Sequence, residues 1–94
     1  MEDLQRLIDA EEFHTILRLI VYKPTPEKFS KVLDNYRNDS SMRAFGVRRN
    51  RQIVGMIGVR SIDETVAEIT HIVVVPERRG QGIGRKLVSD VVSN

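Results

Sequence analysis

Residues 73–88 read Val73-Val74-Val75-Pro76-Glu77-Arg78-Arg79-Gly80-Gln81-Gly82-Ile83-Gly84-Arg85-Lys86-Leu87-Val88, and in them an apolar strand leads through three alternate glycines into an apolar-periodic helix. Because glycine has no Cβ, the backbone can bend sharply here and ligand oxygens can approach its N–H groups closely. A helix that begins near Gly82 adds unpaired amides and a positive dipole end. Four neighbouring side chains add full positive charges: Arg78, Arg79, Arg85 and Lys86. The pattern predicts a cradle for an anion with several phosphates.

Arg85 excludes two other glycine-rich nucleotide motifs. A P-loop that began at Gly80 would need glycine at position 85 and a hydroxyl residue after the lysine, whereas Leu87 follows Lys86. A dinucleotide fingerprint that began at Gly80 would also need glycine at position 85, and too little chain follows for its ribose-binding acid. What the chain does satisfy is the pattern [QR]-x-x-G-x-[GA], at residues 79–84.

With these residues the chain resembles the GNAT superfamily of acyl-CoA N-acyltransferases, whose members carry this pattern where their fourth strand meets their third helix. Residues 53–58 are similar to the third strand of the family, and residues 9–12 to its first strand-to-helix join. The resemblance implies an N-acetyltransferase that moves an acetyl group from acetyl-CoA, its cosubstrate, to a primary amine by direct attack in a ternary complex. The residues that would bind the cosubstrate are Ile72, Val73, Val74, Arg79, Gly80, Gln81, Gly82, Ile83, Gly84 and Arg85.

Glu68 is the candidate general base, because it interrupts an otherwise apolar strand and stands eleven positions before Arg79, an offset used for that role by some members of the family. By resemblance, Glu68 could accept a proton from the substrate ammonium, directly or through water. The alternative is an acid that faces solvent or pairs with an arginine of the neighbouring strand. Since side chains alternate along a strand, His71 should point to the face opposite Glu68.

The chain departs from the family pattern at its C-terminal side. Complete members continue past the third helix, and often take their catalytic acid from a tyrosine on a fourth helix. Tyr22 and Tyr36 do not match that acid, and Tyr36 is expected in the core. We therefore expect residues 1–94 to be a single domain that is incomplete at its C-terminus. The alternative function is a truncated module that binds CoA or a partner protein without turnover, and a homodimer could complete the fold.

Composition narrows the class further. The chain has 94 residues and no cysteine, and its two histidines, His14 beside the apolar stripe of the first helix and His71 in a strand, make a poor metal site. An acidic N-terminus without a long apolar run predicts a cytoplasmic protein with no membrane segment. Residues 43–60 hold five arginines and no acid, which leaves nucleic-acid binding as a weaker alternative to a solvated hairpin edge. The acceptor, a small-molecule or peptide amine, is left open.

The periodicity predicts an α+β fold. A first helix should begin at Asp9, with Glu12 completing the cap, and a second at Thr25 and Pro26 after the break at Pro24. Residues 4–8 could be a short strand or the start of the first helix. Three extended segments follow, at about 42–49, 52–60 and 66–75, with a hairpin turn at residues 50–51 and a last helix at about 82–93. N-terminal helices, an antiparallel meander of three to four strands and a helix at the phosphate loop, packed as an α/β sandwich, resemble the first part of the GNAT fold.

Overall fold

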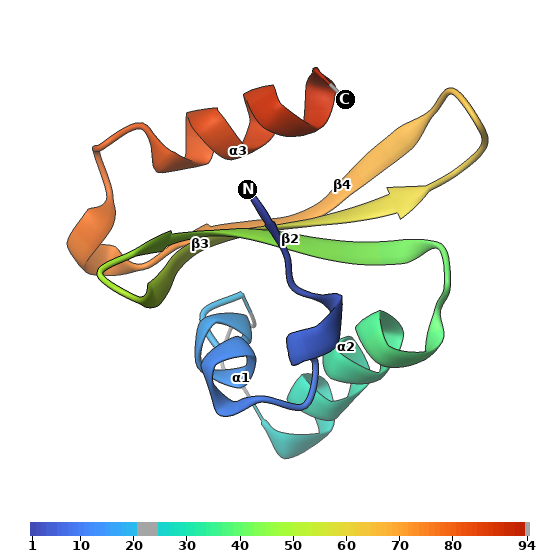
Figure 1. Ribbon diagram of the computed structural model, residues 1–94. Helices are drawn as coiled ribbons and strands as arrows, with labels where there is room; N and C mark the ends of the chain where they lie inside the picture. The colour runs from blue at the N-terminus through green and yellow to red at the C-terminus, as the bar shows by residue number, and fades with distance from the viewer. Residues whose placement is uncertain (21–24, 94) are drawn as a thin grey trace.

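The computed structural model describes residues 1–20 and 25–93. Its elements, in chain order, are β1 (Glu2–Asp3), the 3-10 helix η1 (Gln5–Leu7), α1 (Glu11–Leu17), α2 (Pro26–Asn38), β2 (Met42–Arg49), β3 (Gln52–Ser61), β4 (Ala67–Val74), the 3-10 helix η2 (Pro76–Arg78) and α3 (Ile83–Val92). The strands form one sheet in the order β1-β2-β3-β4, and each pair is antiparallel. Helices α1 and α2 cover one face of this sheet and α3 covers the other (Figure 1). The expected α+β class and meander are confirmed.

The sequence predicts an N-cap for each of α1 and α2, and the prediction for α2 is correct. Thr25 accepts a hydrogen bond from the amide of Lys28 at 3.2 Å, and Pro26 occupies the first helical position, as expected for α2. The predicted cap of α1 by Asp9 is wrong, because Ala10 is the N-cap and makes no side-chain cap. The carboxylate of Asp9 instead pairs with Arg37 of α2. The break predicted at Pro24 lies outside the described residues.

Residues 4–8 form neither of the two expected structures. The strand comes earlier, because Glu2 and Asp3 pair with Gly46 and Phe45 of β2, and η1 follows it. The side chain of Leu4 is completely buried and lies over Gly46, where an added Cβ would stand 2.8 Å from its Cδ1 atom. An unpredicted short strand therefore extends the sheet to four strands.

The sheet has a separate apolar core on each face. On the α1 and α2 face the core contains Leu4, Ile8, Phe13, Ile16, Leu17, Leu33, Tyr36, Met42, Ala44, Ile53, Met56 and Val73, and on the α3 face it contains Val47, Val54, Ile57, Ile83 and Leu87. The predicted hairpin turn is confirmed, with positive φ angles of 52° at Asn50 and 69° at Arg51. In the described part of the chain, no helix has the length and hydrophobicity needed to cross a bilayer.

Two glycines of β3 let the helices approach the sheet closely. A Cβ at Gly55 would stand 2.7 Å from Cγ2 of Ile83, so the absence of a side chain here lets α3 pack closely on one face. A Cβ at Gly58 would stand 1.8 Å from the hydroxyl oxygen of Tyr36, so this glycine admits α2 on the other. Tyr36 is only 1% exposed, and its ring packs edge to face against Phe13 of α1. The side chain of Tyr36 thus crosses β3 and reaches β4.

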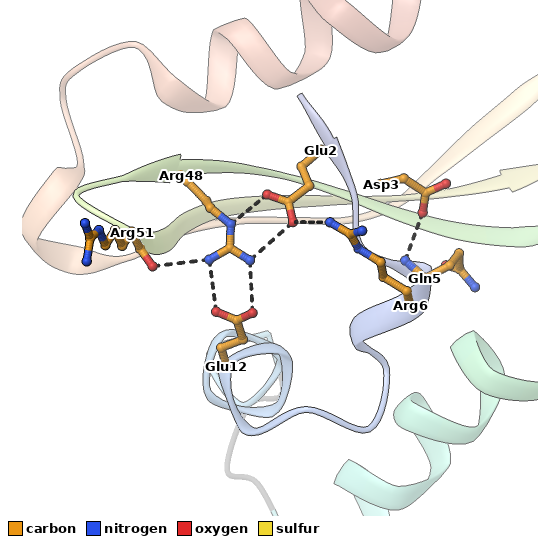
Figure 2. Close-up of polar contacts among 7 residues, drawn as sticks. All are labelled: Glu2, Asp3, Gln5, Arg6, Glu12, Arg48 and Arg51. Atoms are coloured by element: carbon orange, nitrogen blue, oxygen red, sulfur yellow. Dashed lines mark hydrogen bonds and ion pairs between the residues drawn. The ribbon is translucent and has the colours of Figure 1, made fainter.

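Arg48 connects three parts of the chain through one guanidinium group (Figure 2). It donates to both carboxylate oxygens of Glu2 in β1, at 2.7 and 3.2 Å, and to both of Glu12 in α1, at 3.0 and 2.9 Å. A fifth hydrogen bond, of 3.2 Å, goes to the carbonyl oxygen of Arg51 in the hairpin turn. Bidentate pairs of this kind fix geometry as well as charge. Arg48 therefore holds the N-terminus and α1 against the β2-β3 hairpin.

The arginine-rich segment is largely neutralised by acids from elsewhere in the chain. Arg43 pairs with Asp3, and Arg60 lies 4.0 Å from Asp39 and 3.7 Å from Glu68. Together with Arg48, three of the five arginines of this segment are ion-paired. These pairs leave less positive charge for a phosphate backbone than the sequence suggested, which disfavours the nucleic-acid alternative.

Replacing Arg48 by methionine should remove a pH-dependent part of the stability. Hydrogen bonds from Arg48 hold the pKa values of Glu2 and Glu12 below their usual value of 4.5. Because the unfolded chain then binds more protons than the folded one, the contribution is present above about pH 4.5 and is lost as the pH falls through the lowered pKa values. We expect Arg48→Met to have a clearly lower urea midpoint at pH 7, and a much smaller difference from the original protein at the lowest pH at which both remain folded. Arg49→Met, which removes a neighbouring exposed arginine, is the control, and an equal loss at both pH values would contradict the assignment.

Replacing Gly58 by alanine should displace the Tyr36 hydroxyl. Overpacking of this kind costs roughly 1–3 kcal/mol of unfolding free energy. Tyr36→Phe removes the atom nearest to the added methyl group, although the hydroxyl oxygen of Thr70, at 2.7 Å, still crowds it. The double variant Gly58→Ala/Tyr36→Phe should therefore lose less stability than the two single changes added together. Denaturant unfolding of all four proteins measures this coupling. Strict additivity would show that the methyl group and the hydroxyl do not compete for the same space.

Candidate functional site

The glycine loop between β4 and α3 has the backbone shape that the sequence predicts. Gly80 and Gly82 have φ angles of +81° and +80°, and an added Cβ at either would meet nothing within 4 Å. These two glycines are therefore required by backbone conformation and not by crowding. Gly82 is the N-cap of α3 and provides no side-chain cap, so the first amides of the helix, at Ile83, Gly84 and Arg85, have no side-chain acceptor within the described residues. The loop presents N–H groups at the positive end of a ten-residue helix.

Arg79 links this loop to the end of β4. Its Nε atom donates to the carbonyl oxygen of Val74 at 3.0 Å, and the side chain is otherwise exposed. The guanidinium group is therefore positioned between the strand and the helix start, with its terminal nitrogens available to an anion.

A cavity of about 550 Å³ runs along β4 beside this arginine. It is lined by Leu19 and Ile20, which follow α1, by His71, Ile72, Val73 and Val74 of β4, and by Arg79 and Gly84. In the sheet of the described chain β4 is an edge strand, since it pairs with β3 alone. Ile72 is 45% exposed there although its neighbour Val73 is buried. The cavity thus offers an apolar strand edge at one side and cationic and amide donors at the other.

The predicted cosubstrate residues fall into two groups. Five of them line the cavity: Ile72, Val73, Val74, Arg79 and Gly84. The other five do not: Gly80, Gln81, Gly82 and Arg85 are exposed on the loop and first turn of α3, and Ile83 is buried in the core under α3. The side chain of Ile83 occupies the space that Gly55 leaves open, so only its backbone is left to face a ligand.

Glu68 lies apart from the cavity. Its side chain is 55% exposed, and a carboxylate oxygen stands 3.7 Å from a terminal nitrogen of Arg60 on the neighbouring strand. This is the pairing that the sequence left open as the alternative to a base. Glu68 is not among the residues that line the cavity.

An irregularity in β4 overturns the expected alternation between Glu68 and His71. His71 is opposite Gly58 and Ile69 is opposite Val59, so Thr70 is an extra residue in β4. Glu68 is opposite Arg60, which is two residues from Gly58 and therefore on the same face of β3. Glu68 and His71 consequently share the face that α1 and α2 cover, and the prediction that they lie on opposite faces is wrong.

His71 is held by a side chain that sequence reasoning placed only in the core. The hydroxyl oxygen of Tyr36 is 2.6 Å from Nδ1 of His71 and 3.2 Å from the hydroxyl oxygen of Thr70. Burial, and to a lesser degree the charge of Arg60, lowers the pKa of His71 below its usual value of 6.5. Burial raises the pKa of Tyr36, so the phenol stays protonated at neutral pH. The only sequence signal for this cluster was Gly58 in the middle of a strand, which indicates close approach by another group.

The comparisons with known proteins agree with this architecture. Residues 7–93 match the family model described as the acetyltransferase (GNAT) family. An uncharacterized N-acetyltransferase from the lysA 3' region of Bacillus methanolicus is 34% identical over 62 residues, which are 66% of this chain and 52% of that protein. The chain therefore spans about half the length of this curated relative.

Two solved structures have a similar fold at low sequence identity. A ribosomal-protein-alanine N-acetyltransferase from Brucella melitensis superposes with a TM-score of 0.73 at 23% identity, covering 93% of this chain and 64% of that one. AAC(6')-Iy in complex with a CoA bisubstrate analog superposes with a TM-score of 0.70 at 10% identity, covering 94% of this chain and 64% of that one. With the family model matching nearly the whole sequence and the fold in agreement, this chain belongs to the acetyltransferase (GNAT) family.

Proposed function

We propose that this chain binds acetyl-CoA along β4 and transfers its acetyl group to a primary amine. The observation that carries the proposal is the cavity itself, which joins the edge of β4 to Arg79 and to the start of α3. The complex of AAC(6')-Iy contains a CoA bisubstrate analog, and that protein has the same fold. Because the chain spans 64% of the length of that protein, activity and acceptor are both parts of the proposal.

Residues of the glycine loop, of α3 and of β4 would share the binding of acetyl-CoA, although only some of them line the cavity. The amides of residues 81–84, at the positive end of α3, would hold the pyrophosphate, and Arg79 and Arg85 would add charge. The edge of β4 at residues 72–74 offers backbone groups that can pair with an extended amide chain as an added strand would. Acetyl-CoA brings the thioester, and a strand amide would polarise its carbonyl group. An amine could then attack in a ternary complex that the cavity orients.

The acceptor is proposed only by chemical class. Relatives of this fold include a protein named as a ribosomal-protein-alanine N-acetyltransferase and a spermidine N-acetyltransferase from Vibrio cholerae, the latter with a TM-score of 0.58. Peptide and small-molecule amines are therefore both candidates. A second function is the binding of CoA or of a partner protein without turnover, for which the same cavity would serve. Thiol release over a panel of amines separates the two functions, and light scattering tests whether the chain forms a homodimer.

Replacing Gly84 by alanine should affect stability and cosubstrate binding in opposite directions. A Cβ at this position would make ordinary contacts, at 3.7 Å from Val74 and 3.9 Å from Ile72. Since alanine is the better helix former, we expect the free protein to gain up to about 1 kcal/mol. We also expect acetyl-CoA to bind about tenfold or more weakly by calorimetry, because the methyl group enters the cavity and separates a phosphate from the amides.

Ser89→Ala is the matched control for this experiment. It lies on the same helix, is exposed and does not line the cavity, so it should leave acetyl-CoA affinity unchanged. No binding of acetyl-CoA by the folded unaltered chain would refute the proposed function. Equal affinity of Gly84→Ala and the unaltered chain would refute the position assigned to the pyrophosphate.

Glu68 stays a prediction as the general base. Loss of a general base lowers turnover by about 10²–10⁴-fold. Turnover of Glu68→Gln, measured by thiol release at saturating acetyl-CoA, therefore decides its role. A drop of that size would support the assignment, and unchanged turnover would exclude it.

A further inference from the structure

We propose that His71 accepts the proton that the acceptor amine loses, and that Tyr36 is the positioning residue that holds the imidazole ring through Nδ1. This inference rests on the proposed function, since it concerns amine acetylation in the same cavity.

The first reason is position. His71 lines the cavity together with Ile72, Val73 and Val74, the strand segment proposed to lie beside the cosubstrate. Because Thr70 is an extra residue in β4, His71 lies opposite Gly58 of β3. Gly58 has no side chain, so the hydroxyl group of Tyr36 can cross β3 at this point and reach His71. The ring is therefore anchored from the buried side and is available from the cavity side.

The second reason is the hydrogen-bonding chain behind the ring. Tyr36 can give its proton to the hydroxyl oxygen of Thr70, at 3.2 Å, and then its own oxygen can accept from Nδ1–H of His71, at 2.6 Å. This arrangement leaves the lone pair of Nε2 free, and Nε2 has no hydrogen-bond partner among the described residues. The same arrangement satisfies Nδ1–H after the ring takes up a proton, so no hydrogen bond must reverse during the reaction.

The third reason is charge. Among the described residues, the charged and titratable groups near the ring are Tyr36 of α2, Arg60 of β3, Glu68 of β4 and Arg79 beside the cavity. Burial and Arg60 lower the pKa of His71, so the ring is neutral and able to accept a proton at pH 7. Glu68 is engaged by Arg60 instead of facing the cavity.

The proposed step moves two protons and replaces one C–S bond by one C–N bond. Nε2 of His71 takes one proton from the acceptor ammonium, and the resulting neutral nitrogen attacks the thioester carbon. A C–N bond forms, and the C–S bond breaks with its electron pair moving to sulfur. The second proton of the nitrogen goes to the thiolate, directly or through water, and His71 returns its proton to solvent.

Kinetics of three variants test the role in turnover. His71→Gln keeps a polar group near Tyr36, and we expect its kcat to fall by about 10²-fold or more with little change in KM for acetyl-CoA. We expect the ascending limb of kcat/KM against pH to disappear in His71→Gln and to move to lower pH in Tyr36→Phe, because the imidazolium has lost its acceptor. Added imidazole should restore part of the turnover of His71→Ala. His14→Gln, which changes the other histidine, is the control and should keep the normal rate and pH profile.

A measurement independent of turnover tests the hydrogen-bonding chain. The ¹⁵N NMR shifts of the two ring nitrogens distinguish the tautomers, and only two histidines need assignment. We expect the neutral ring of His71 to carry its proton on Nδ1, and the ring to lose this preference in Tyr36→Phe. A proton on Nε2 in the unaltered protein would overturn the proposal, since that nitrogen could not then accept another.

The outcomes separate this inference from the function on which it rests. Absence of acetyl-CoA binding by the folded chain refutes the proposed function. Turnover that survives in His71→Gln with its pH limb intact refutes the role of His71 alone, and a large loss in Glu68→Gln without one in His71→Gln assigns the base to Glu68. If acetyl-CoA binds but no amine is acetylated, the tautomer decides: Nδ1–H supports the proposal and Nε2–H overturns it.

Discussion

The structure depends on a central strand that is buried on both faces. Residues 53–58 of β3 are all buried, so the sheet must be covered by a helical layer on each side. On one face of this strand the side chain of Ile83 of α3 packs over Gly55, and on the other face the side chain of Tyr36 of α2 packs over Gly58. Side chains at these two positions would push the layers away, and close packing of this kind tolerates little change in volume.

Both ends of the candidate site are anchored on this strand. Ile83 is the first residue of α3, so its contact with Gly55 determines where the helix begins and where the loop amides lie. Tyr36 crosses Gly58 to reach β4 and holds His71 on the cavity. The start of α3 and the ring of His71 are thus positioned by neighbouring contacts on one strand, although Ile83 and Tyr36 lie far apart in the sequence.

Features set by neighbours in the sequence could be predicted, and features set by distant partners could not. The cap at Thr25, the turn at residues 50–51 and the glycine loop each depend on a few consecutive residues, and all three are present. The cap at Asp9 was wrong because Arg37, twenty-eight residues away, takes its carboxylate. The strand at residues 2–3 was missed because two residues carry no periodicity, and pairing with β2 and with Arg48 is what holds them.

The sequence by itself determined the family, the order of the main elements and the glycine-rich, positively charged character of residues 79–85, because these follow from glycine positions, periodicity and charge along the chain. Only the tertiary structure decided which polar side chain lines the cavity. Strict alternation placed Glu68 and His71 on opposite faces, whereas one extra residue at Thr70 brings them to the same face. An irregularity in strand register depends on pairing with β3 and on the space above Gly58, and neither is visible in the local pattern of β4.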